Sequence, residues 1–333
     1  MNTHKIIVGV DVSADELVCA TLPRQAGIQP CYSNSARGVK ALVGALQRLL
    51  GPEPGEVHVI MEATGNLHVR LQDALWEASV PCSLLQPLVM THYARMKGTR
   101  NKTDAVDAAL LARYGAEQSP APSAPIGSVR RQIKQLGTTI RALIIERTRL
   151  RNQVGALRRL PSPDAACVRE LSGMLKDVER RIARLEKRQA AVVAAHYGEE
   201  VALLCSIKGI GSRTATALVA YAGDLSGFGS PRQLVAYIGT NPARRYSGTS
   251  LHVNGGISKQ GNRHLRTLFY MAALTARRHN ASCRALYDRL VAKGKTKKQA
   301  LIAVASKLIR QAWGVLHHRQ PFIDGFGLQP LTS

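Results

Sequence analysis

The first 120 residues alternate between short apolar runs and amphipathic segments, and this order restricts the fold more than any other feature of the sequence. Three β-branched runs come first, at 5–13, 16–22 and 28–34, with turn residues between them. A segment with the apolar rhythm of a helix follows, then the buried strand VHVIME, a second amphipathic helix, the short strand PCSLLQP and a return to helix near Thr103. The order strand-strand-strand-helix-strand-helix-strand-helix predicts an α/β, ribonuclease-H-like sheet.

Charge is divided unevenly along the chain. Residues 1–120 hold 11 Lys and Arg against 11 Asp and Glu, whereas residues 121–333 hold 35 against 11, which is the whole formal net charge of +24. A surplus this large on a folded chain indicates a polyanionic partner such as nucleic acid, or less often an anionic membrane surface. With 333 residues, of which 45% are hydrophobic, the chain is long enough for two domains with cores.

Several classes of protein are excluded early. The N-terminus has no long apolar segment behind a basic start, and no run of about 18 uncharged apolar residues occurs, so we expect a cytoplasmic protein without a membrane partner. The six cysteines are scattered without a Cys-x-x-Cys pair. Their spacing argues against both a zinc site and a disulfide framework.

Four acidic residues are expected at one edge of the predicted sheet. Asp11 ends the first strand and Glu62 the fourth, and the carboxyl ends of neighbouring strands converge on the crevice where ligands bind. Asp104 and Asp107 would lie on one face of a helix, in its first turns. The repulsion between these carboxylates is relieved if Mg²⁺ or Mn²⁺ lies among them, and two ions roughly 4 Å apart would polarise a phosphodiester. The alternative is structural, with Thr103 as an N-cap before a dipole-stabilising Asp pair.

Beyond the first domain, residues 1–115, the sequence predicts a helical arm. Residues 116–128 are rich in Pro, Ser, Gly and Ala and are interpreted as a linker. Across 129–195, apolar residues follow a 3–4 spacing on either side of a PSPD turn, which predicts an antiparallel helical hairpin or an oligomerising coiled coil. The many arginines of this arm indicate a solvated face, or alternatively contact with an RNA or DNA backbone.

The basic C-terminal part, residues 196–333, is expected to be mainly helical. A Gly-Ile-Gly turn lies between two apolar helical segments in LLCSIKGIGSRTATALVAYAG. It resembles a helix-hairpin-helix element, in which backbone N–H groups at a helix N-terminus hold a phosphate. Lys208, Gly209 and Gly211 are therefore candidate nucleic-acid contacts, as are Arg100 and Lys102 beside the Asp pair, although short Gly-x-Gly turns are common.

A serine among cations is a candidate nucleophile. Ser247 lies in a Gly-containing loop just after Arg244 and Arg245. Downstream, three further cations are expected on one helix face: Lys259, Arg263 and Arg266. Guanidinium groups would bind a phosphate and offset the charge of the transition state as the hydroxyl attacks. The structural alternative is a turn serine that bonds to its own backbone, and Thr249 and Ser250 compete for the catalytic role.

These motifs together resemble a known family. GVDVS, IMEATG, RNKTDAVDA, IKGIG, NPARRYSG and GGISKQGNRHLR, in this order between about residues 5 and 325, are similar to the DEDD transposases of bacterial insertion-sequence family one-ten. The resemblance implies a RuvC-like N-terminal domain whose Asp-Glu-Asp-Asp tetrad falls on Asp11, Glu62, Asp104 and Asp107. It also implies a C-terminal transposase domain whose nucleophilic serine maps to Ser247.

The resemblance carries further expectations about partners. Members of the family are guided by a bridge RNA encoded beside the gene and act on donor and target DNA. They work as multimers, here a dimer or tetramer, with a composite site built from a RuvC-like domain and a transposase domain. The expected activity is metal-dependent DNA strand transfer through a phosphoserine intermediate, in the bacterial cytoplasm at the nucleoid.

Three other functions are alternatives to this one. A junction-resolving nuclease would share the fold and the tetrad but hydrolyse with water. A non-catalytic RNA-binding protein would keep the acidic residues only as structural remnants. A sugar-kinase-like or actin-like ATPase would need phosphate-binding glycine loops, which we do not find, and would leave the charge of +24 unexplained.

Overall fold

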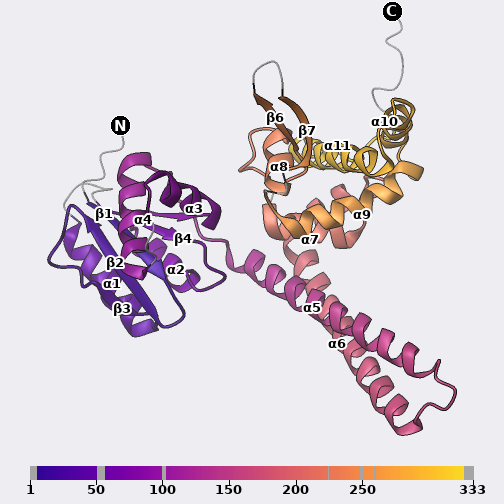
Figure 1. Cartoon of the computed structure of the whole chain (residues 1–333), viewed down its shortest axis with the longest axis horizontal. Coiled ribbons are helices and arrows are strands. Elements are labelled where there is room, and N and C mark those ends of the chain that lie inside the picture. Colours follow the sequence, from indigo (N-terminus) through magenta and orange to yellow (C-terminus); the bar gives the residue numbers. More distant parts are fainter. Residues whose placement is uncertain are drawn as a thin grey trace, which may run out of the picture. The chain divides into compact units, whose positions relative to one another are not determined.

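The chain divides into two compact units, Met1–Ile126 and Gly127–Ser333. Figure 1 shows the computed structural model, which describes residues 6–50, 57–99, 103–223, 225–247, 251–258 and 260–325. Each unit has hydrophobic clusters of its own.

Unit 1 is built on a five-stranded sheet in the order β3-β2-β1-β4-β5. Its strands are β1 (Ile6–Val12), β2 (Glu16–Leu22), β3 (Cys31–Ser33), β4 (Val57–Glu62) and β5 (Cys82–Leu85). The first three pair antiparallel, and β4 pairs parallel with both β1 and β5. β1 and β4 are central and almost fully buried, as their continuous apolar runs predict.

Four helices cover the two faces of this sheet. They are α1 (Ala36–Leu49), α2 (Val69–Glu77), α3 (Pro87–Met96) and α4 (Asp104–Gln118). Side chains of a strand alternate between faces, so Val8 and Val10 join the cluster under α1 and α2, whereas Ile7 packs with residues of α3 and α4. Unit 1 is thus an α/β domain with helices on both faces.

The segment 116–128, which we interpreted as a linker, is placed differently. Its first residues complete α4, and 119–126 belongs to unit 1. Ser123 N–H donates to the carbonyl of Cys82 (2.7 Å), and Ser123 Oγ accepts from Leu84 N–H (3.2 Å). This segment therefore hydrogen-bonds to backbone and side-chain groups of β5 at the outer edge of the sheet, and it is not a flexible linker.

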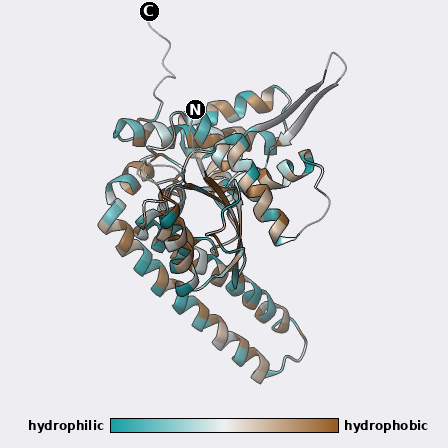
Figure 2. Ribbon diagram, turned by 90° about the vertical axis from the view of Figure 1, so that its left-hand side faces the viewer, coloured by the Kyte–Doolittle hydropathy of each residue, from teal (hydrophilic) through white to brown (hydrophobic). Residues whose placement is uncertain are grey.

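Unit 2 begins with a long antiparallel pair of helices, α5 (Ser128–Leu157) and α6 (Ala165–Cys205) (Figure 1). Arg151 pairs with Glu179 across the pair at 2.8 Å, and Gln189 Nε2 donates to the carbonyl of Ile133 at 3.0 Å. Hydrophobic and hydrophilic residues alternate along both ribbons in Figure 2, as expected of amphipathic helices. The predicted helical hairpin is present.

The rest of unit 2 is a helical bundle with one β-hairpin. The helices are α7 (Ser212–Ala222), α8 (Pro231–Ile238), α9 (Arg263–His279), α10 (Ala281–Ala292) and α11 (Lys297–His318). Strands β6 (Pro242–Ser247) and β7 (Leu251–Ile257) pair antiparallel. Phe269 and Leu308 are fully buried in a cluster that also includes Leu204 at the end of α6. Within the described ranges, no helix is long and apolar enough to cross a membrane.

Candidate functional site

Two of the four predicted acidic residues lie at the carboxyl ends of adjacent parallel strands, Asp11 as the penultimate residue of β1 and Glu62 as the last residue of β4. Val10 of β1 pairs with Met61 of β4, and Asp11 and Glu62 are the next residues of the two strands. Both lie at the carboxyl end of the sheet. The sequence predicted this placement from the strand ends alone.

Asp11 and Glu62 also lie on the same face of the sheet. Ile7 and Ile60 pack in one cluster with Leu111 of α4. Asp11 and Glu62 follow these two residues by an even number of positions in β1 and β4, so their side chains are directed to the face that α4 covers. The two carboxylates therefore share the side of the sheet on which the helical Asp pair is found.

Helix α4 runs antiparallel to β1 and brings its first turn toward that edge. A side chain at Gly9 would clash with the carbonyl of Ala108, and one at Gly115 would lie 2.6 Å from Ile7. The helix therefore starts above the carboxyl end of β1 and ends above its beginning. Asp104 and Asp107 occupy the first turn of α4, so four acidic residues converge on one edge of unit 1.

The local sequence explains why α4 begins here. Thr103 has extended backbone angles, and its side chain accepts a hydrogen bond from Val106 N–H at 3.3 Å. A threonine N-cap followed by aspartates is favourable because carboxylates stabilise the positive end of the helix dipole. The structural role that we weighed for these residues is present, and it is compatible with a role in binding.

The donor set has the chemistry of a hard-cation site. Asp11, Glu62 and Asp107 are half-buried and Asp104 is exposed. Carboxylate oxygens are the ligands that Mg²⁺ and Mn²⁺ prefer. Among the described residues, however, no group of three or more His, Cys, Asp or Glu side chains is close enough to hold a metal ion. The backbone positions converge, and the side chains would have to rotate toward one another when an ion binds.

Ser247 is the last residue of β6. The strand pairs with β7 through Ser247 and Leu251, and it also contains Arg244 and Arg245. The segment that we predicted as a loop is therefore a β-hairpin with Ser247 at the end of its first strand. Five candidates lie outside the described residues: Arg100, Lys102, Thr249, Ser250 and Lys259.

The two arginines of α9 that the sequence predicted as nucleic-acid contacts, Arg263 and Arg266, differ in their surroundings. Arg263 begins the helix and is exposed. Arg266 donates from Nη1 to the carbonyl of Ile238 at 3.1 Å, at the end of α8. A guanidinium is favourable there because the last carbonyls of a helix carry partial negative charge. Arg266 thus joins α8 to α9, and its guanidinium is engaged by this structural contact.

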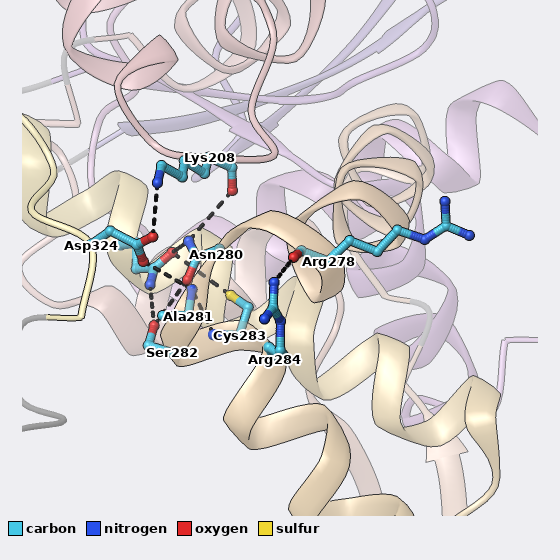
Figure 3. Close-up of polar contacts among 9 residues, drawn as sticks. Lys208, Arg278, Asn280, Ala281, Ser282, Cys283, Arg284 and Asp324 are labelled. Carbon is cyan, nitrogen blue, oxygen red and sulfur yellow. Dashed lines mark hydrogen bonds and ion pairs between the residues drawn. The ribbon is translucent and has the colours of Figure 1, made fainter.

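The Gly-Ile-Gly turn connects α6 to α7. Gly209 has φ +111°, and a Cβ there would lie 2.6 Å from the Cβ of Ala276, so the turn packs tightly on α9. Lys208 Nζ pairs with Asp324 at 3.1 Å (Figure 3). Burial acts to raise the pKa of the Asp324 carboxyl, but the hydrogen bond from Ala281 N–H and the contacts with Lys208 outweigh it, so that the pKa is lowered. Gly211 is the N-cap of α7. Lys208 therefore has an acidic partner within the chain.

A small cavity between the arm and the bundle is lined in part by a histidine that no sequence motif singles out. His264 is among the lining residues of this cavity of about 50 Å³ between α5, α6, α7 and α9. Burial lowers the pKa of His264 to about 4, and the nearby cations Arg141 and Arg213 act in the same direction. The imidazole is consequently neutral at neutral pH. No sequence signal distinguished this histidine within the basic stretch around it.

Two family models match the chain. Residues 8–160 match the model "DEDD_Tnp_IS110: Transposase", and residues 201–288 match the model "Transposase IS116/IS110/IS902 family". The first segment contains all four converging acidic residues. The second contains the Gly-Ile-Gly turn and the β6–β7 hairpin.

Individual relatives agree with these matches. The pilin gene-inverting protein of Moraxella bovis is 29% identical over 325 residues, which cover 96% of this chain and 98% of that protein. The insertion element IS110 uncharacterized 43.6 kDa protein of Streptomyces coelicolor is 33% identical over 149 residues, 45% of this chain and 36% of that protein. The transposase for insertion sequence element IS1111A of Coxiella burnetii is 31% identical over 150 residues, 44% of this chain and 40% of that protein.

Proposed function

The chain belongs to the IS110 family of DEDD transposases, and we propose that it cuts and rejoins DNA with an acidic metal site in unit 1 and a serine nucleophile in unit 2. As a DNA transposase it is an enzyme whose substrate is DNA. The observation that carries the proposal is the convergence of Asp11, Glu62, Asp104 and Asp107 at one edge of the sheet.

We assign unit 1 to the ribonuclease-H-like, RuvC-like class. Support comes from the strand order 3-2-1-4-5, with an antiparallel start followed by two parallel strands. Acidic residues at the ends of β1 and β4 and at the start of α4 are consistent with this assignment. We likewise assign the α5–α6 hairpin the role of a coiled-coil arm, supported by its interhelical pairs.

The four carboxylates would hold Mg²⁺ or Mn²⁺. The bound metal would polarise the scissile phosphate and offset the negative charge that develops on it. The role of the protein is to hold the four carboxylates near one edge of the sheet. The backbone positions of β1, β4 and α4 accomplish this. Half-burial of Asp11, Glu62 and Asp107 limits competition from bulk water.

The serine step conserves phosphodiester bonds. The Oγ of Ser247 attacks the phosphorus, a Ser–O–P bond forms, the P–O bond to the leaving DNA oxygen breaks, and the serine proton passes to solvent or to that oxygen. A DNA hydroxyl then attacks the phosphoserine, which restores the serine and joins new strands. Arg244 and Arg245, three and two positions before Ser247 in β6, are candidates to hold the phosphate.

We further propose that a bridge RNA selects the DNA and that the chain acts as a homo-oligomer with a composite site. The charge supports an RNA and DNA partner, because unit 2 contains the whole surplus of +24. Base pairing by a guide would supply the sequence specificity that side chains otherwise provide. A protein acting on chromosomal DNA would be located at the bacterial nucleoid.

The decisive experiment combines Ser247→Ala with a covalent-adduct assay. Wild-type protein incubated with its guide RNA, labelled donor DNA and Mg²⁺ should yield DNA that migrates with the protein after denaturation. Ser247→Ala should lose both this adduct and strand cleavage while it still binds RNA and DNA. Thr249→Ala and Ser250→Ala are matched controls and should keep the adduct.

The same assay separates the two parts of the proposal. Asp11→Asn should lose cleavage in Mg²⁺ without a change in DNA binding. Normal cleavage by Ser247→Ala, or cleavage without any adduct, would replace the serine with water as nucleophile, as in junction-resolving nucleases. Cleavage that is indifferent to Asp11→Asn and to chelation of Mg²⁺ would instead contradict the acidic metal site.

A further inference from the structure

We propose that an open cleft between α9 and α10 binds phosphate groups of a nucleic-acid backbone, an inference that rests on the proposed nucleic-acid function of the chain. The cleft has a volume of about 370 Å³. Its lining is almost entirely charged: Arg277, Arg278, Arg284, Tyr287 and Asp288. Three of the five lining residues are arginines, the side chain best suited to binding phosphate.

The corner that forms the cleft is fixed from inside the protein. Asn280 is both the C-cap of α9 and the N-cap of α10, and it is fully buried. Its Oδ1 accepts from Cys283 N–H at 3.1 Å, and its Nδ2 donates to Gln311 Oε1 at 3.1 Å and to the carbonyl of Lys208 at 3.4 Å (Figure 3). These contacts hold the end of α9 against the start of α10. The arginines are therefore attached to a preorganised backbone.

Arg277 forms the inner wall of the cleft and has an unmet hydrogen-bond donor. Its guanidinium lies 5.3 Å from the ring centroid of Tyr287, and Nη1 contacts the Tyr287 hydroxyl at 3.4 Å. The Nε atom is buried and has no hydrogen-bond partner among the described residues. Because Nε is buried, a phosphate in the cleft would meet the outer N–H groups of this guanidinium, which the contact with Tyr287 holds in place.

Arg278 and Arg284 form the outer wall and are exposed. Arg284 donates from Nη2 to the carbonyl of Arg278, and the Arg278 side chain extends away from Arg284 (Figure 3). Asp288 forms no ion pair with these arginines in the part of the chain that the structure describes. Three cations against one anion leave the cleft positive, and the separated guanidiniums suit two successive phosphates better than a single anion.

The family and the charge distribution of the chain indicate which ligand the cleft binds. The chain belongs to a family that acts on DNA, and its charge surplus lies in the unit that contains this cleft. A phosphodiester backbone offers acceptors for Arg277 and charge for the two outer arginines without requiring a particular base sequence. The cleft would therefore position nucleic acid on unit 2 and would not read its sequence.

The test is a binding measurement on the full-length protein with Arg278→Gln and Arg284→Gln combined. Fluorescence anisotropy with a labelled duplex DNA, and separately with a labelled structured RNA, should be measured across a range of salt concentrations. Loss of two phosphate contacts should lower the slope of log affinity against log salt by about 2 and reduce the affinity at low salt by about tenfold. The probe whose affinity falls, the duplex DNA, the structured RNA or both, shows which nucleic acid occupies the cleft.

Two matched variants isolate the cleft. Arg289→Gln with Arg310→Gln removes the same charge from exposed positions of unit 2 outside the cleft, and Arg278→Lys with Arg284→Lys keeps the charge within it. The Arg278→Lys, Arg284→Lys variant should retain the wild-type salt slope. The Arg289→Gln, Arg310→Gln variant should lose less affinity and less salt slope than the Arg278→Gln, Arg284→Gln variant. Equal losses for the two glutamine pairs, or a lost slope for the lysine pair, would overturn the proposal. A wild-type protein that binds no nucleic acid would instead contradict the proposed function.

Discussion

At the scale of single residues, Gly9 sets the distance between the sheet and the helix that carries two of the four acidic residues. A Cβ at this position would meet the carbonyl of Ala108, the backbone N of Ala112 and the side chain of Leu111. These are mainly backbone atoms inside a helix, which cannot rotate away. The spacing of Asp104 and Asp107 from Asp11 therefore depends on the absence of a side chain at residue 9.

Gly9→Ala should destabilise unit 1 by about 2 kcal/mol, because α4 must move away from β1. Urea unfolding of a 1–126 fragment, followed through the fluorescence of Trp76, measures the effect. Gly44→Ala is the control, since its nearest neighbour is the end of the Arg48 side chain at 3.9 Å. It should be neutral or stabilising by roughly 0.5–1 kcal/mol, the difference in helix propensity. Equal stability of the two variants would refute the close contact at Gly9.

At the scale of elements, the periodicity of apolar residues predicted the amphipathic helices and the buried strands. It did not predict features that depend on contacts with residues far away in the sequence. The strands around Asp11 and Glu62 and the helices on either side of them follow from apolar spacing, as does their common edge. Helix α3 was not predicted, because only Gln86 separates it from β5 and its first residue, Pro87, belonged to the segment predicted as a strand. The contact of Arg266 with the end of α8 was not predicted either, because no local pattern reveals an acceptor 28 residues away.

Residues 119–126, after α4, are a second case in which a contact distant in sequence was not predicted, and their contribution to stability can be tested. Ser123→Ala removes the acceptor of Leu84 N–H at the edge of β5, which should lower the stability of the 1–126 fragment by about 1 kcal/mol. The same urea titration detects the loss. Ser162→Ala, measured in the full chain at the exposed turn between α5 and α6, should stay within about 0.5 kcal/mol of wild type. An unchanged Ser123→Ala fragment would mean that residues 119–126 do not stabilise the sheet.

At the scale of the whole molecule, function is divided between a neutral unit and a basic one. Unit 1 contains 11 cationic and 11 anionic residues, and unit 2 contains 35 and 11, since residues 121–126 are uncharged. The division was visible in the sequence because charge can be counted without a fold. The cleft at Arg277 and Arg284 was not, because only the corner at Asn280 brings these arginines together.

Separate fragments should show this division directly. In the absence of divalent metal, residues 127–333 should retain most of the affinity for duplex DNA and its steep salt dependence, whereas residues 1–126 should bind weakly. Anisotropy titrations of both fragments against one DNA probe provide the measurement. Comparable affinity of the 1–126 fragment without metal would show that the charge surplus does not determine where the backbone binds.

Helix α6 connects the turn of the arm to the core of unit 2 as one element. Its 41 residues correspond to about 60 Å, and its end contributes the fully buried Leu204 to the bundle. Tyr197, at φ −143° and ψ 25°, is the non-helical residue within it. The helix is kinked at Tyr197, so the segment that leads to the turn at 158–164 and the segment that enters the bundle are two helical pieces joined at this residue. A change of angle at Tyr197 would redirect the arm while leaving the packing beneath the Gly-Ile-Gly turn in place.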